Sequence, residues 1–223
     1  MDKKLFSNYQ NFIPKHFSGE HEDSKRLFVT FKRLLSFIKL NHMNSSSKLL
    51  DLGSGNGSFV NVCNENGFNA VGLDGSKDNI DFEKDQLKFD NDTFDIITLV
   101  SVIEHINNPS NILKEIFRVL KKGGIVIIVT PNFKYSFRNF YDDPTHIRPY
   151  SHKSIDTLMK LYEFKTLKVV PMLVDKPLFF WKIPFSFFLS SILPFKNHQL
   201  KNFPLINFLK GKSTAMISIS EKN

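Results

Sequence analysis

A glycine-rich turn between an apolar run and a helix-compatible segment is the part of this sequence best suited to binding a ligand. Residues 48–52 (KLLDL) form a short apolar run typical of a buried strand, residues 53–57 read GSGNG, and residues 58–66 can form a helix. Glycines let the backbone turn sharply and approach a ligand closely, and the start of a helix presents unpaired N–H groups. The pattern therefore predicts a nucleotide-binding loop. Its expected contact residues are Gly53, Ser54, Gly55 and Gly57.

Two acids at strand ends narrow the choice of ligand. Asp51 lies beside the loop, and Asp74 ends the next predicted strand, residues 69–74. The Asp51 carboxylate would repel a pyrophosphate but suits a cationic ligand, whereas an acid at position 74 can accept hydrogen bonds from ribose hydroxyls. S-adenosylmethionine fits both, because it carries a sulfonium and an ammonium and has no phosphate. A glycine cluster alone would be equally compatible with an ordinary turn.

Three stretches together resemble a known family. LDLGSGNGSF, VGLD and FDIITLVSVIEHI are similar to segments of the class I S-adenosylmethionine-dependent methyltransferases, in particular the small-molecule branch with quinone-biosynthesis and sugar or polysaccharide enzymes. The resemblance covers residues 48–130 well and 142–170 more loosely. The matching motifs identify the cofactor specifically but say little about which substrate is methylated.

The alternation of strand and helix patterns predicts a doubly wound α/β sheet. Beyond the elements above, we expect strands at 79–82, 94–101, 125–130, 164–170 and 213–220, and helices at 24–40, 111–120 and 154–162. The resemblance implies a Rossmann-like sheet of seven strands, with the last strand antiparallel between strands five and six. We expect an N-terminal arm and helix over residues 1–47 and a methyltransferase domain over residues 48–223.

The remaining cofactor contacts are implied by the resemblance. In the family, an acid after the third strand binds the adenine amino group, and the backbone of the next residue contacts the ring. Asp81 and Phe82 match these positions best, and residues 85–86 are the second choice because the connection after Asp74 is short. A solvated acidic turn is the structural alternative. At the end of the fourth strand, Ser101 and Glu104 complete the expected set.

Two histidines are candidates for the catalytic base. Methyl transfer from a sulfonium mainly needs alignment, but an alcohol acceptor gains from a base with a pKa near neutral, which suits histidine. His146 lies in DPTHIRPY, a segment that resembles one bordering the acceptor pocket in the sugar branch. His105 follows Glu104 near the expected methyl position. We favour His146, because a Glu-His pair at this place can also serve only to order the loop or the cofactor.

No metal ion is expected from the sequence. Some quinone O-methyltransferases use a Glu-x-x-Glu-His metal site at this position, but Ser101 replaces its first glutamate here. Glu104 and His105 alone would make a weak site. Activity is therefore expected to survive chelation.

Composition limits the compartment and the partners. A single cysteine, Cys63, excludes an internal disulfide and fits a reducing compartment; residues 1–10 lack the apolar stretch of a signal peptide. Residues 160–223 carry ten lysines against three acids, +7 of the chain's net +8. This stretch contains no arginine and no recognised nucleic-acid motif, so we expect a cytoplasmic protein that does not bind nucleic acid.

A phenylalanine-rich segment, residues 177–210, stands before the last expected strand. It contains eight phenylalanines and one tryptophan, with lysines around them. We expect a helical insertion that packs on the sheet edge or at a homodimer contact; the alternatives are a substrate lid or a patch at the inner face of the membrane.

Three functions remain open on these grounds. The first is methylation, at oxygen, of a small molecule, a sugar or glycan precursor, or a lipid-linked precursor, by a monomer or homodimer. The second is an NAD-dependent oxidoreductase, which Asp51 disfavours, as does Ser58 where GxGxxG would need a third glycine. The third is a non-catalytic domain that keeps the cofactor pocket. The intact set of Asp51, Gly53, Gly55 and Asp74 favours the first.

Overall fold

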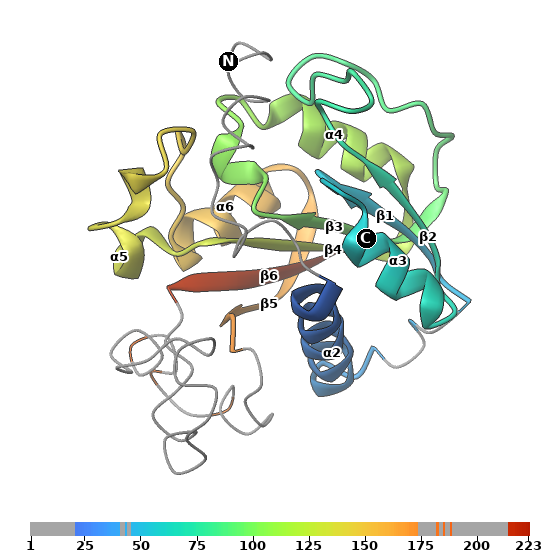
Figure 1. Cartoon of the computed structure of the whole chain (residues 1–223), viewed down its shortest axis with the longest axis horizontal. Helices are drawn as coiled ribbons and strands as arrows, with labels where there is room; N and C mark the ends of the chain where they lie inside the picture. Colours follow the sequence, from blue (N-terminus) through green and yellow to red (C-terminus); the bar gives the residue numbers. More distant parts are fainter. Residues whose placement is uncertain are drawn as a thin grey trace.

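A mixed six-stranded sheet forms the centre of the molecule (Figure 1). The structure, a computed structural model, describes residues 21–40, 43, 46–173, 182, 185, 188 and 214–223. The strand order is β2-β1-β3-β4-β6-β5. The strands are β1 (Lys48–Leu52), β2 (Asn69–Leu73), β3 (Phe94–Val100), β4 (Leu120–Pro131), β5 (Phe164–Pro171) and β6 (Ala215–Lys222).

The direction of the strands agrees with the methyltransferase expectation. Strands β1, β2, β3 and β4 run parallel to one another, whereas β6 is antiparallel to both β4 and β5. The last strand of the chain therefore lies between its two predicted neighbours and runs in the predicted direction. The pairing of β4 and β6 extends over seven residues, from Ile125 with Glu221 to Pro131 with Ala215.

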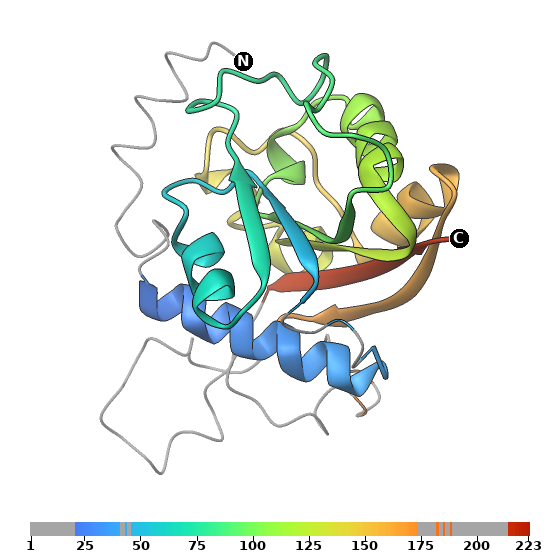
Figure 2. The same cartoon turned by 90° about the vertical axis from the view of Figure 1, so that its right-hand side faces the viewer.

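Helices cover both faces of the sheet (Figures 1 and 2). Helices α2 (His21–Phe37) and α3 (Ser58–Glu65) share one apolar core with β3, β4 and β6, to which α2 contributes Phe28, Phe31 and Leu34. Helices α4 (Ser110–Val119) and α6 (His152–Leu161) share the other core, with Ile112 and Ile155 fully buried. The doubly wound arrangement is thus confirmed.

The central strands are apolar on both faces because both faces are covered. In β4 every residue from Ile125 to Thr130 is buried, and in β3 only Asp95 and Val100 are partly exposed. Burying one such aliphatic side chain contributes about 1.5–3 kcal/mol. The buried core strands hold the sheet as a rigid platform whose carboxyl edge carries the candidate site.

The expected strand at residues 79–82 is wrong, and the described residues form six strands, not seven. Residues 74–93 form successive turns, with Asn79 in the left-handed region at φ 53°.

The backbone hydrogen-bonding groups at the outer edge of β2 have a side-chain partner in place of a further strand. The side-chain amide of Asn64, in α3, pairs with both backbone groups of Ala70, at 2.8 Å to its N–H and 3.0 Å to its carbonyl oxygen.

Other boundaries differ locally. Strand β4 begins at Leu120 rather than at 125, because residues 121–124 bulge out opposite Asp95, with Gly123 in the left-handed region at φ 72°. The expected loop 133–150 contains α5 (Phe133–Ser136) and η2 (Phe140–Asp142).

The expected N-terminal arm and nearly all of the phenylalanine-rich segment lie outside the described residues. No helix in the described part of the chain is long and apolar enough to cross a membrane.

Candidate active site

The predicted site residues gather at the carboxyl edge of the parallel strands. Gly53 follows β1, Asp74 follows β2 and Ser101 follows β3; Asn132, which was not predicted as a site residue, follows β4. Parallel strands that end at one edge bring residues distant in sequence together, and this is where open α/β sheets bind ligands.

The glycine loop is held to β2 and leaves space above it. The N–H of Gly53 donates to the carbonyl oxygen of Leu73 at 2.7 Å, and at φ 78° a β-carbon on Gly53 would collide with Val102. Gly55, at φ 53°, is different, because a β-carbon there would meet nothing within 4 Å. Gly53 thus serves the fold, whereas the space beside Gly55 is open; we call this open space the cradle, because a ligand can approach the backbone there.

Asp74 organises the loop that it was predicted to serve. One carboxylate oxygen accepts from the N–H of Gly55 at 3.1 Å. The other accepts from the N–H and the hydroxyl of Ser76, at 3.0 and 2.7 Å, and from the N–H of Lys77. The acid therefore joins the glycine loop to the turn after β2, in addition to any contact with a ribose.

Asp51 is a buried carboxyl next to the loop. Only 4% of the residue is exposed, and Thr98 donates its hydroxyl hydrogen to it at 2.6 Å. Burial raises the pKa of Asp51 to about 7, the Thr98 hydrogen bond opposes this, and the negative charge of Asp74 adds to it. A cationic ligand nearby would favour the ionised form.

The segment expected to meet the adenine is a tight turn stabilised by its own acids. The N–H of Asp81 donates to Asp85 at 2.7 Å, and Asp81 accepts from the N–H of Glu83. The Phe82 side chain packs against the main core. Glu83 in turn accepts from the backbone N–H groups of residues 107 and 108, both at 3.0 Å, so the turn is fastened to the segment that follows η1.

Ser101 is the first residue after β3 and has a rare backbone conformation. Its φ is 54°, in the left-handed region that non-glycine residues seldom adopt, and its N–H donates to Val129 at 2.9 Å. Such positions cluster at functional sites. Its conformation redirects the chain into η1 (Ile103–His105), which carries the next two candidates.

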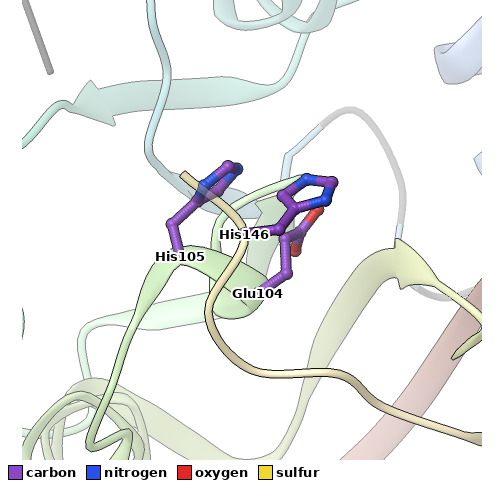
Figure 3. A group of neighbouring side chains, drawn as sticks. All are labelled: Glu104, His105 and His146. Carbon is purple, nitrogen blue, oxygen red and sulfur yellow. The ribbon is translucent and has the colours of Figure 1, made fainter. Parts of the chain in front are cut away.

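Glu104, His105 and His146 form one cluster (Figure 3). One potential ligand atom from each residue lies within 4.8 Å of the others. The two imidazole rings have centroids 4.8 Å apart. Residues 41 and 42 positions apart meet because the carbonyl oxygen of Glu104 accepts from the N–H groups of both Ile147 and Arg148, each at 3.0 Å.

Hydrogen bonds fix which nitrogen of each ring carries hydrogen. Nδ1 of His146 lies 2.7 Å from the carbonyl oxygen of Phe140, which can only accept, so Nδ1 donates. Nδ1 of His105 lies 3.1 Å from the carbonyl oxygen of Thr145. Neutral imidazoles with Nδ1–H carry their lone pair on Nε2. Burial lowers the pKa of His105 and so favours this neutral form.

Glu104 is entirely buried at the base of the cluster. Thr130 donates to its Oε2 at 3.0 Å, and among the described residues no group hydrogen-bonds Oε1. Burial raises the pKa of Glu104 to about 7. A fully buried carboxyl with an unpartnered oxygen is stabilised when that oxygen binds a proton, a water molecule or a cation.

Three threonines support the site and were not predicted. Thr98 holds Asp51, Thr130 holds Glu104, and Thr145 contacts His105 through both its carbonyl oxygen and its hydroxyl. Thr98 and Thr130 had a signal in the sequence, because each is a polar residue inside a run of buried aliphatic residues. Thr145 had none, because its partner lies 40 residues away.

Comparison with known proteins assigns the chain to a family. A family model described as a methyltransferase domain matches residues 19–169, well over half of the chain. The chain therefore belongs to this methyltransferase family, and the resemblance to the class I S-adenosylmethionine-dependent methyltransferases is confirmed. S-adenosyl-L-methionine is the cofactor of this class.

Two curated relatives are ubiquinone biosynthesis O-methyltransferases. The chain is 35% identical over 101 residues to the one from Pelagibacter ubique, a match over 38% of this chain and 42% of the relative. It is 31% identical over 122 residues to the one from Rickettsia typhi, over 47% of this chain and 49% of the relative. The matches thus span less than half the length of either relative.

Solved structures share the fold. An S-adenosylmethionine-dependent methyltransferase from Archaeoglobus fulgidus matches with a TM-score of 0.60 at 19% identity, over 96% of this chain and 100% of that one. Another, from Mesorhizobium loti, matches with a TM-score of 0.57 at 12% identity, over 79% and 91%. At such identities the likeness concerns the fold alone.

Proposed function

We propose that the protein transfers a methyl group from S-adenosylmethionine to an oxygen atom of a small-molecule acceptor. The observation that carries the proposal is the joint position of two features at one sheet edge. The open cradle at Gly55, with Asp74 beside it, suits the cofactor, and the imidazole pair of His105 and His146 suits the acceptor. Oxygen as the acceptor atom is supported by the relatives named above.

Each residue of the cofactor half has a defined role in this proposal. Gly55 leaves room for the ligand, Asp74 accepts from the ribose hydroxyls, and Asp51 offers negative charge to the ammonium group. Asp81 and the backbone of Phe82 meet the adenine. The bound cofactor supplies a methyl group that is already activated, so the chain's task is to hold the two reactants in line.

The acceptor half supplies a base, and the loop that carries this base also carries exposed apolar side chains. With Nδ1 of His146 donating to Phe140, its Nε2 can accept the proton of an acceptor hydroxyl. The loop that carries His146 exposes three large apolar side chains, Phe137, Tyr141 and Ile147. They favour an acceptor with an apolar or aromatic portion, and a phenol or lipid-linked precursor fits this surface better than a free sugar does.

Calorimetry with S-adenosylmethionine, S-adenosylhomocysteine and NAD tests the cofactor half. We expect the first two to bind and NAD not to bind. Gly55→Val should abolish binding, because the added side chain enters the cradle and because a β-branched residue is strained at φ 53°; circular dichroism verifies that the variant is folded. Asp74→Ala should weaken binding about ten- to a hundredfold, as for loss of a charge-assisted hydrogen bond. Unchanged affinity in both folded variants would contradict the assignment.

Turnover of an acceptor tests the other half. His146→Ala should lower turnover by about 10²–10⁴-fold, with cofactor affinity near that of the wild type. If His105→Ala abolishes turnover and His146→Ala does not, the two roles are exchanged. Full turnover in both variants would show that alignment alone suffices.

A further inference from the structure

We propose that Glu104, His105 and His146 bind a divalent transition-metal ion, with the loop residue His146 as the third ligand. The inference concerns what the chain binds in the absence of any acceptor, so it goes beyond the proposed reaction. It also replaces the sequence-based expectation that no metal is needed.

The spacing of the three side chains suits a shared ion. Their potential ligand atoms all lie within 4.8 Å of one another. Ligands bound tetrahedrally to one ion at about 2.0–2.2 Å lie roughly 3.3–3.6 Å apart, so metal binding needs the widest pair to close by up to about 1.5 Å. The side chains come from two segments, η1 and the loop after η2, and they converge in Figure 3.

Oε1 of Glu104 is available as a ligand atom for a cation. The residue has no exposed surface, its Oε2 is taken by Thr130, and no described residue hydrogen-bonds Oε1. A buried carboxylate oxygen without a partner is costly. A bound cation would remove that cost.

The histidines are oriented as metal-binding histidines commonly are. A ligating imidazole usually donates its other N–H to a carbonyl or carboxylate, which fixes the ring. Here Nδ1 of His146 donates to Phe140, and Nδ1 of His105 lies against Thr145. The hydroxyl of Thr145 donates to Asp143, so toward His105 it can only accept.

The surroundings also favour a cation. The carboxylate of Asp143 lies 3.8 Å from Nε2 of His146, adding a second negative charge beside Glu104. Two imidazoles and one carboxylate suit manganese, iron, cobalt or zinc better than magnesium or calcium, which prefer oxygen ligands.

This ligand set differs from the Glu-x-x-Glu-His pattern. That pattern would take a carboxylate from position 101, where this chain has Ser101. The third ligand comes instead from the loop, 41 residues after His105. When bound, a divalent ion acidifies a coordinated hydroxyl. In the metal-bound protein His146 would be a ligand, and the base role proposed for it above would apply to the metal-free protein.

Cobalt binding tests the site directly. Chelator-treated wild-type protein is titrated with Co²⁺, and the visible absorption of the ion and calorimetric stoichiometry are recorded. We expect one ion per chain. Glu104→Gln and His146→Gln should each weaken binding at least about tenfold. His152→Ala, which removes a histidine outside the cluster, should bind as the wild type does.

Three results decide between the outcomes. Absence of saturable cobalt binding by the wild type would overturn the proposal, as would wild-type affinity in both variants. If Glu104→Gln fails to fold, judged by circular dichroism, His146→Gln on the loop still decides. Calorimetry with S-adenosylmethionine on the same samples distinguishes the two proposals. Binding of the cofactor without binding of cobalt would refute only the metal site. Failure to bind the cofactor would refute the proposed function, whether or not cobalt binds.

Discussion

Asp51 shows how burial of a single carboxyl makes the stability of a protein depend on pH. Its carboxyl is buried, and its pKa is about 7, against 3.8 for an ordinary aspartate. Between these values the folded protein holds a proton that the unfolded chain releases. The free energy of unfolding therefore falls as the pH rises from about 4 to 7, by up to roughly 4 kcal/mol. The stability is fully present below the unfolded pKa and is lost above the folded one.

We expect Asp51→Asn to be more stable than the wild type at pH 8 and to lose this pH dependence, because the amide needs no proton and can still accept from Thr98. Urea unfolding at pH 5 and pH 8 measures the difference. The exposed Asp90→Asn is the matched control and should behave as the wild type does. Calorimetry should show the opposite trend for S-adenosylmethionine, with wild-type affinity rising through pH 7 and the Asp51→Asn affinity low throughout. A variant no more stable than the wild type at pH 8 would contradict this account of the buried charge.

At the scale of an element, the outer edge of β2 is closed by a side chain. In a parallel strand the N–H and carbonyl of one residue point to the same side. Asn69 bonds toward β1 through Ser47, so both groups of Ala70 point outward, and both are met by Asn64. The amide thus takes the place of a neighbouring strand, and the sheet ends there.

Asn64→Ala should therefore destabilise the protein by about 1–3 kcal/mol, the cost of leaving buried backbone groups unpaired. Urea unfolding measures this loss. Asn61→Ala, at an exposed position of the same helix, is the control and should change stability by less than about 0.5 kcal/mol. We also expect more self-association in Asn64→Ala, because an open strand edge can pair with another chain. Equal stability of the two variants would show that the Asn64 pairing is dispensable.

Local sequence patterns predict the helices and strands of this fold better than they predict which residues distant in sequence contact each other. Strand β1 and helices α3 and α4 lie within one or two residues of the expected bounds, because apolar spacing and the residues that end an element act locally. The third strand failed because it was inferred from a family pattern, and the chain closes that edge with Asn64. The glycine loop, Asp51 and Asp74 were expected at one edge. The meeting of His146 with Glu104 was not expected, because it depends on two backbone hydrogen bonds between residues 43 and 44 positions apart.

At the scale of the whole molecule, positive charge is concentrated toward the carboxyl end. Residues 160–223 hold +7 of the net +8. Of the phenylalanine-rich segment the structure describes three residues, and all are exposed: Lys182, Phe185 at 81% and Phe188 at 52%. Exposed aromatic side chains beside a lysine favour a surface that is both apolar and anionic.

We therefore predict salt-sensitive binding to anionic lipid vesicles, which would place the enzyme beside a lipid-linked or phosphate-bearing acceptor. Each basic residue near an anionic surface contributes about 1 kcal/mol, and high salt screens this attraction. Sedimentation with neutral and anionic vesicles, at low and high salt, measures binding. A triple variant with Phe185→Ser, Phe188→Ser and Lys182→Gln should no longer bind the vesicles. The control variant, Leu161→Ser with Lys114→Gln, removes an exposed apolar side chain and a lysine elsewhere on the surface, and it should still bind them. If the wild type stays in the supernatant under every condition, these aromatic side chains serve a protein contact or a soluble acceptor instead.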